Sequence, residues 1–129
     1  MSEAQCIHLD TNVLIFGLLP EHPIHGQLFE RNRQGEVFAA SAMAWSEFHC
    51  GPVSSHQIAA WETLLAGGVL PIDRAVSERA AALFNQTGRR SRTLPDCIVA
   101  ATAISHGAPL VTLNRTDFER FLPYGLVLA

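Results

Sequence analysis

Hydrophobic residues along the chain alternate between short continuous runs and longer segments with helical spacing. Five short apolar runs are typical of buried strands, at residues 6–9, 37–40, 69–72, 109–112 and 126–128. Between them lie segments with apolar residues every three or four positions, as at residues 56–65. Pro71 in the third run indicates an edge strand or a strand end. Strands that alternate with helices predict an α/β sandwich on a central parallel sheet of four to five short strands.

The most apolar helix is predicted over residues 95–105. Pro95 suits the first turn because its missing N–H is not needed there, and Gly107 followed by Pro109 ends the helix. The helix is apolar on nearly every face, which is typical of a buried element. Its single acid, Asp96, lies in the first turn. Such an acid either complements the helix dipole or belongs to a functional site.

Other helices are predicted from shorter patterns. Residues 25–33 are expected to form a surface helix with Leu28 and Phe29 pointing inward. Ser41 and Asp73 each precede a helical segment and are expected to cap it through their side-chain oxygens. We assign no chemistry to Asp73.

Four acidic residues lie at the ends of predicted elements or among aromatic neighbours. Asp10 ends the first strand, Asp96 opens the buried helix and Asp117 follows the fourth strand. Glu47 lies in an apolar helical segment and is either part of an exposed stripe or held in a site. Asp10 could equally be an N-cap, and the two roles can coexist. Because groups at the carboxyl ends of parallel strands meet at one edge, these acids can converge there.

Converging carboxylates predict a metal site. They repel one another and raise one another's pKa unless a divalent cation compensates their charge. Oxygen ligands of this kind suit Mg²⁺ or Mn²⁺. Such an ion supports hydrolysis of a phosphodiester by polarising the phosphoryl oxygen and activating water.

Composition narrows the function classes. Charged residues make up 16% of the 129-residue chain, against about 25% in typical domains. The chain therefore has more apolar surface than a monomer needs, and we expect a partner to cover part of it. All nine basic residues are arginine, which excludes P-loop NTPases and Schiff-base enzymes because both need a lysine.

Charge gives only a local indication of nucleic-acid binding. The net charge of −3 offers no general attraction for a polyanion. Arg89, Arg90 and Arg92 form a basic loop directly before the Asp96 helix. This loop is either solvated surface or a set of phosphate contacts.

Three cysteines at unrelated spacings favour reduced thiols in a cytoplasm. The first five residues lack the basic region of a secretory signal. No apolar run reaches the roughly 18 residues of a membrane span. We therefore expect a cytoplasmic protein without a membrane segment.

Four motifs lie in order along the chain, at residues 9–14, 45–48, 94–103 and 110–118. Together they resemble the motifs of PIN domains, and in particular those of VapC-type ribonuclease toxins of bacterial toxin–antitoxin pairs. The resemblance covers about residues 5–129 and implies a single PIN-like domain over 1–129, a three-layer α/β/α sandwich. It further implies a Mg²⁺- or Mn²⁺-dependent endoribonuclease, a homodimer and a small antitoxin partner.

The resemblance also implies site residues. Asp10, Glu47 and Asp96 match the first three family acids, with Asp10 and Asp96 as the metal ligands. Many relatives carry the fourth acid where this chain has Asn114, so that role passes to Asp117. Glu47 and Asp117 then complete the acidic pocket and help to position the attacking water.

Two neighbouring polar residues and an apolar surface complete the predicted roles. Asn12 and Thr112 are expected to orient carboxylates by hydrogen bonding. An apolar surface near Trp45, Phe48 and Trp61 is expected to receive the antitoxin.

Three other functions compete with a toxin. One is a PIN nuclease for RNA processing, and another is a non-catalytic PIN-like interaction module. A haloacid-dehalogenase-like phosphatase also begins with a strand-end aspartate. It needs an acid at the position of Asn12 and a lysine, and this chain has neither.

Overall fold

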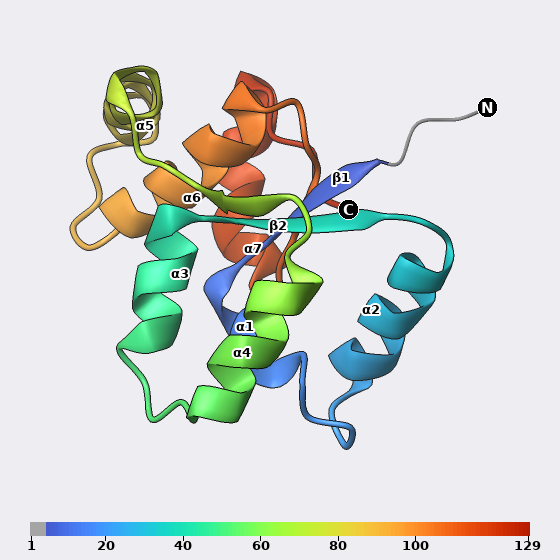
Figure 1. The fold of residues 1–129 in the computed structure, drawn as a ribbon. Coiled ribbons are helices and arrows are strands. Elements are labelled where there is room, and N and C mark those ends of the chain that lie inside the picture. Colours follow the sequence, from blue (N-terminus) through green and yellow to red (C-terminus); the bar gives the residue numbers. More distant parts are fainter. Residues whose placement is uncertain (1–4) are drawn as a thin grey trace.

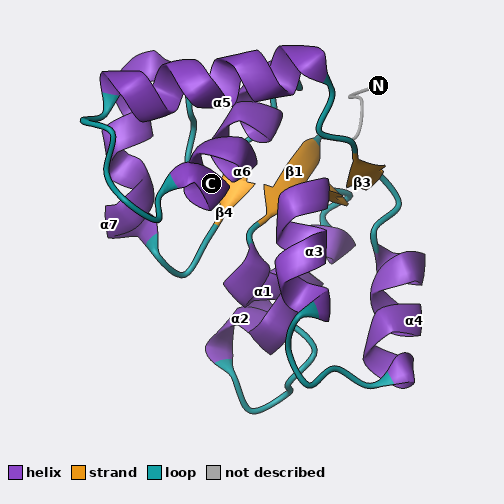
Figure 2. Ribbon diagram, turned by 90° about the vertical axis from the view of Figure 1, so that its left-hand side faces the viewer, coloured by secondary structure: helices purple, strands orange, loops and turns teal. Residues whose placement is uncertain are grey.

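The computed structural model describes residues 5–129 and shows one parallel sheet between two helical layers (Figure 1). Its strands are β1 (Cys6–Leu9), β2 (Val37–Ser41), β3 (Gly68–Leu70) and β4 (Leu110–Val111). One face is covered by α1 (Thr11–Phe16), α2 (Pro23–Arg33), α3 (Ala42–His49) and α4 (Ser55–Leu64). The other face is covered by α5 (Arg74–Gln86), α6 (Leu94–Ser105) and α7 (Arg115–Phe118) (Figure 2). A 3₁₀ helix, η1 (Glu119–Tyr124), follows α7. The predicted three-layer α/β/α sandwich is confirmed.

The strand order β3-β2-β1-β4 determines where functional groups can meet. The chain builds outward from β1 through β2 to β3, and then returns to place β4 on the free side of β1. The order therefore reverses between β1 and β4, where Leu9 pairs with Val111. In open parallel sheets, ligand-handling groups lie beyond the carboxyl ends of the strands at such a reversal. Asp10 and Thr112 directly follow these two strands.

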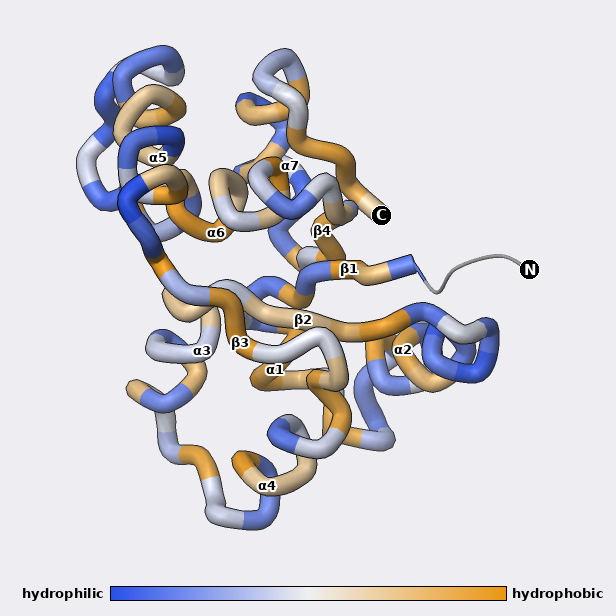
Figure 3. Tube along the Cα trace, turned by 45° about the horizontal axis from the view of Figure 1, so that its top comes forward, coloured by the Kyte–Doolittle hydropathy of each residue, from blue (hydrophilic) through white to orange (hydrophobic). Residues whose placement is uncertain are grey.

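Helix α6 is the buried helix that the sequence predicts. Six of its residues are buried: Cys97, Val99, Ala100, Ala101, Thr102 and Ala103. Figure 3 shows α6 among hydrophobic segments, whereas much of the neighbouring α5 is hydrophilic. The helix ends at Ser105, and Gly107 follows with a left-handed φ of 61° that a residue with a side chain rarely adopts. Small side chains let α6 approach the sheet closely and carry Asp96 to the edge of the core.

The predicted caps are confirmed. The Ser41 hydroxyl accepts the Ala44 N–H at 3.0 Å at the start of α3. The Asp73 carboxylate accepts the Val76 N–H at 2.8 Å at the start of α5. Both side chains supply an acceptor to a helix end that would otherwise leave its N–H groups unpaired.

Three predictions about apolar residues are wrong. Phe29 was expected to point inward but is 68% exposed, because α2 buries the face that carries Ile24 and Leu28. Phe48 and Trp61 were expected on a docking surface, yet each is only 1% exposed and lies in the core. The Trp61 indole donates to the Leu14 carbonyl at 2.9 Å, which satisfies its N–H inside the core.

The predicted fifth strand, at residues 126–128, is wrong, because this segment forms no continuous strand. Leu128 forms one isolated parallel bridge with Leu110. Gly125 ends η1 with a φ of 107°, so the chain aligns with β4 only after that turn. Because β4 is two residues long, little of its edge is available for pairing.

No helix within residues 5–129 is both long and apolar enough to cross a membrane. The expectation that the first five residues are not a secretory signal falls mainly on residues 1–4, which lie outside the described residues.

A buried histidine lies at the centre of the sheet. His8 in β1 is 1% exposed, and within residues 5–129 neither ring nitrogen has a hydrogen-bond partner. Its ring centroid lies 5.7 Å from that of His106. Burial, together with the charge of His106, lowers the pKa of His8 from 6.5 to about 4.

This burial predicts acid sensitivity that depends on one side chain. The folded protein holds His8 neutral, whereas the unfolded chain protonates it below 6.5, so stability is lost as the pH falls from 6.5 towards 4. His8→Leu removes this linkage. The free energy of unfolding of the variant minus that of the wild type should be about 2 kcal/mol more favourable at pH 5 than at pH 7.5. Urea denaturation of both proteins at the two pH values measures this. Parallel pH dependences would contradict it.

Candidate active site

The site is centred on Asp10, which is only 5% exposed at the carboxyl end of β1. One carboxylate oxygen accepts the Thr11 N–H at 2.8 Å and caps α1. The other accepts the Thr112 hydroxyl at 2.7 Å, and that hydroxyl accepts the Asn114 N–H at 3.0 Å. These bonds connect the ends of β1 and β4. They fix the orientation of the carboxylate at the point where the strand order reverses.

Glu47 reaches the same region from α3. Its Oε1 accepts the Thr11 hydroxyl at 2.9 Å, so Thr11 contacts Asp10 through its N–H and Glu47 through its side chain. Glu47 itself is exposed. Packing of α1 against α3 therefore brings a second carboxylate beside the buried one.

Asp96 joins them from the first turn of α6. Its carboxylate is 37% exposed, and its Oδ2 accepts a bond from Arg120 Nη2 at 3.4 Å. Burial raises the pKa of Asp96 from 3.8 to about 6, and the negative charge of Asp10 adds to this rise. Arg120 acts in the opposite direction, while Asp117 and Glu47 raise the pKa further.

Asp10 responds to the same neighbours. Burial raises its pKa, and the hydrogen bonds from Thr112 and Thr11 oppose that rise. The charges of Glu47 and Asp117 raise it further. The structure thus brings the four predicted acids into one electrostatic cluster at the predicted edge of the sheet.

Two side chains are candidates for the role of the fourth acid, Asn114 and Asp117. Both are exposed at the start of α7. The Asn114 side chain makes no capping hydrogen bond to α7. Asp117 is the one whose charge acts on both Asp10 and Asp96.

The donor set fits a hard divalent cation. Asp10 and Asp96 are two partly desolvated carboxylates, the negative charge of Asp10 raises the pKa of Asp96, and a cation would relieve that repulsion. Mg²⁺ commonly takes one or two protein carboxylates and keeps several waters. Within the described residues, no three acidic, histidine or cysteine side chains converge as a ready-made metal cage. The arrangement therefore fits an ion held by two carboxylates and water.

Two neighbouring side chains have roles that the sequence did not indicate. Thr11 bridges Asp10 and Glu47, and Arg120 contacts Asp96. Asn12 also differs from its expected role, because its side-chain oxygen accepts the Leu113 N–H at 3.3 Å and so holds the loop after β4. Thr11 could have been found from the sequence, because it directly follows the strand-end aspartate Asp10. Nothing local indicated Arg120, which is 24 residues from its partner.

The basic loop lies exposed between α5 and α6. Arg89 and Arg92 adopt left-handed φ values of 53° and 68°, and Arg89 donates to Asn85 at 3.1 Å. None of the three loop arginines forms a salt bridge within residues 5–129. The loop is adjacent to the Asp96 helix in the chain but makes no ion pair with the acids.

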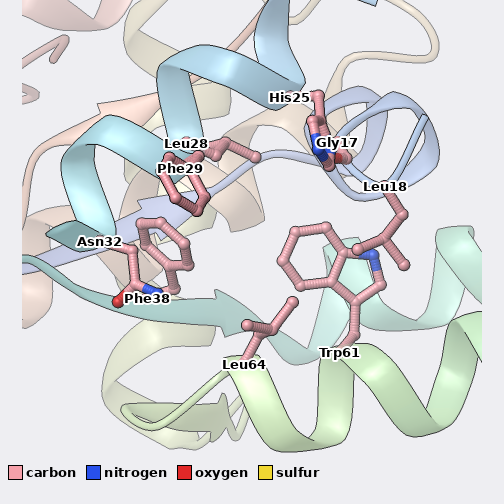
Figure 4. Close-up of a pocket in the computed structure, with 9 residues that line it drawn as sticks. All are labelled: Gly17, Leu18, His25, Leu28, Phe29, Asn32, Phe38, Trp61 and Leu64. Carbon is pink, nitrogen blue, oxygen red and sulfur yellow. The ribbon is translucent and has the colours of Figure 1, made fainter. Parts of the chain in front are cut away.

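A separate apolar pocket lies on the face covered by α1 to α4. It is a cavity of about 170 Å³ bordered by Gly17, Leu28, Phe29, Trp61 and Leu64 (Figure 4). A side chain at Gly17 would come within 2.5 Å of the Val13 carbonyl and 2.8 Å of Leu28, so glycine is required there. Phe29, at 68% exposure, extends the apolar surface beyond the pocket.

Comparison with known proteins identifies the fold family. The family described as PIN domain matches residues 7–121. A chain of a toxin–antitoxin complex from Klebsiella pneumoniae is 28% identical, with a TM-score of 0.66 over 88% of this chain and 90% of that one.

Two more distant structures share the fold. VapBC2 from Rickettsia felis, bound to a promoter DNA fragment, gives 18% identity and a TM-score of 0.72 over 97% of this chain and 98% of that one. VapBC-1 from nontypeable Haemophilus influenzae gives 21% identity and a TM-score of 0.70 over 97% of both chains. No curated protein gives a significant match. Since the family match spans residues 7–121 of the 129-residue chain, the chain belongs to the PIN-domain family.

Proposed function

We propose that this protein is a Mg²⁺- or Mn²⁺-dependent endoribonuclease, a single-domain cytoplasmic toxin of a type II toxin–antitoxin pair. The observation that carries the proposal is the position of Asp10 at the reversal point of the sheet, where Glu47, Asp96 and Asp117 are close enough for their charges to interact with the site. The raised pKa values of Asp10 and Asp96 show that their charges are unfavourable in the metal-free fold, and a divalent cation would offset that cost.

Within this proposal, Asp10 and Asp96 hold the metal ion. When bound, a divalent ion polarises a phosphoryl oxygen and lowers the pKa of water. The Thr112 hydroxyl keeps one Asp10 oxygen in place, and the Thr11 hydroxyl does the same for Glu47. Glu47 and Asp117 complete the pocket and orient the attacking water by accepting its hydrogen bonds.

The alternatives have less support. A non-catalytic interaction module has no need for four mutually repelling acids, yet burial and like charge raise the pKa of both Asp10 and Asp96. A PIN nuclease for RNA processing would use the same chemistry. The toxin is favoured because the Klebsiella chain, 28% identical over 88% of this chain, comes from a toxin–antitoxin complex.

The proposed partners are an antitoxin and a second copy of the chain. We place the antitoxin at the apolar pocket beside Phe29, where an apolar side chain can fill the cavity. This replaces the surface around Phe48 and Trp61, because both side chains are in the core. Remaining exposed apolar side chains, such as Ile15 at 40% and Val127 at 58%, are available for a homodimer.

The first test of this proposal is cleavage. Asp10→Asn and Asp96→Asn should each reduce RNA cleavage in Mg²⁺ or Mn²⁺ by at least about 100-fold, because each removes a carboxylate from the metal. Cleavage of a labelled RNA at saturating protein measures the rate, and Asp73→Asn is the control because Asp73 only caps α5. Wild-type cleavage in excess EDTA, or full activity of either variant, would refute the mechanism.

Removing Asp96 should also stabilise the metal-free protein. Because the folded pKa of Asp96 is raised to about 6, stability is lost as the pH rises from 3.8 through about 6 and the penalty is complete above it. Allowing for solvent screening of this half-exposed group, Asp96→Asn should gain about 1 kcal/mol at pH 7.5. The melting temperature should rise by roughly 3–5 °C at pH 7.5 and by little near pH 4. An equal gain at both pH values would show that charge repulsion is not its cause.

The proposed docking surface can be tested with a candidate antitoxin, the protein encoded by a short reading frame next to this gene whose sequence has a DNA-binding pattern. That protein should bind the wild type and inhibit cleavage. Phe29→Asp should weaken binding by at least about 10-fold, because it places a charge against an apolar partner. Ile72→Asp, which places the same charge at an exposed apolar residue between β3 and α5, is the matched control. Equal binding by the wild type and Phe29→Asp, measured by calorimetry, would exclude this pocket as the antitoxin site.

A further inference from the structure

Arg120 lies in η1 between two anchored aromatic residues. Phe118 and Phe121 are 1% and 0% exposed, and their rings meet edge to face at 5.8 Å. The Arg120 guanidinium carbon lies 4.7 Å from the centroid of the Phe121 ring. A cation over an aromatic face at this distance is held by a cation–π interaction. The position of the guanidinium is therefore fixed by the core and not by a flexible loop.

Arg120 has more hydrogen-bonding capacity than the protein uses. A guanidinium carries five N–H donors, and the side chain is only 19% exposed. Among the described residues, its salt-bridge partner is Asp96 at 3.4 Å, which is long for a charge-assisted hydrogen bond. Within residues 5–129 its Nε is buried without a partner. A desolvated cation with one weak bond indicates that a further anionic acceptor belongs beside it.

The other arginines differ from Arg120 in their partners. Arg31, Arg33 and Arg74 pair with glutamates outside the site. In the part of the chain that the structure describes, Arg120 alone forms an ion pair with one of the four acids. The acidic pocket repels a polyanion, so a substrate phosphate needs a fixed positive charge close to the reacting group.

We propose that Arg120 contacts the scissile phosphate of the RNA and stabilises the negative charge that develops on it during cleavage. This inference rests on the proposed ribonuclease function and names a residue that would touch the substrate. The planar guanidinium offers several donors, so a phosphate oxygen can bind beside Asp96 without displacing it. In a partly desolvated site, a pre-positioned donor stabilises developing charge more strongly than it would in water.

Two other roles for Arg120 make different predictions. If it only joins η1 to α6, its loss lowers stability but leaves metal affinity and cleavage by the folded protein unchanged. If it only orients Asp96, its loss weakens metal binding in proportion to the loss of cleavage. A phosphate contact predicts a loss of cleavage with metal affinity unchanged or tighter, because a positive charge near the cation has been removed.

The experiment compares Arg120→Gln, Arg120→Lys and the control Arg79→Gln, which removes an exposed arginine of α5 with the same change in charge. Single-turnover cleavage at saturating RNA, calorimetric Mn²⁺ affinity and the salt dependence of RNA binding in Ca²⁺ are measured for each. Arg120→Gln should cleave roughly 10- to 100-fold more slowly, with Mn²⁺ affinity at or above that of wild type. The salt slope should fall by about 0.7.

Arg120→Lys should recover part of the rate, because lysine keeps the charge but lacks the planar pair of donors. If Arg120→Gln does not fold, as judged by circular dichroism, Arg120→Lys provides the test. Its single-turnover cleavage rate should then be about 3- to 10-fold below that of the wild type. Cleavage by the Arg120 variants equal to that of Arg79→Gln would overturn the inference, as would a parallel loss of Mn²⁺ affinity. Absence of cleavage by the wild type would instead reject the proposed function itself.

The same assay separates Arg120 from the basic loop. Replacing Arg89, Arg90 and Arg92 together by glutamine should weaken RNA binding and its salt dependence, while cleavage at saturation falls much less. A loop variant that loses cleavage at saturation as Arg120→Gln does would move the phosphate contact to the loop and overturn the assignment of Arg120.

Discussion

The burial of one carboxylate, that of Asp10, is the constraint on which the rest of the site depends. At 5% exposure its charge is stable only with nearby donors, which the Thr112 hydroxyl and the Thr11 N–H supply at 2.7 and 2.8 Å. These two bonds require β4 to lie against β1 and α1 to begin immediately after β1. The strand order and the start of the first helix are therefore what allow this carboxylate to be buried with both of its donors.

The remaining acids are held near Asp10 at a cost in stability. Burial and the charge of Asp10 raise the pKa of Asp96 to about 6, so the metal-free fold contains an unfavourable interaction at neutral pH. The rigid buried helix α6 keeps Asp96 in place despite that repulsion. Arg120, fixed over Phe121, compensates part of it. These opposing charges are the basis of the proposal that the site binds a cation and an anion at adjacent positions.

The two proposed binding regions are built from different elements. The four acids come from the end of β1 and from α3, α6 and α7, while the end of β4 supplies Thr112. The apolar pocket is bordered by residues of α2, α4 and β2 and by Gly17 and Leu18, which follow α1 (Figure 4). Helix α1 is shared, because Thr11 at its start contacts Asp10 and Glu47 while Gly17 follows its end at the pocket. A protein bound at the pocket would therefore contact Gly17, which directly follows the helix that Asp10 caps.

The sequence by itself determined the type and order of most elements, because strand and helix periodicity and end caps are local properties. It also determined that Asp10 and Asp96 stand at element ends. The order of the four motifs along the chain indicated a PIN domain, which the family match confirms. Only the tertiary structure decided that Phe29 is exposed while Phe48 and Trp61 are buried, since the buried face of a helix depends on what packs against it. The same holds for the bond between Thr112 and Asp10, 102 positions apart, and for the contact of Arg120 with Asp96. Such contacts are determined by how the layers pack, and no local pattern encodes them.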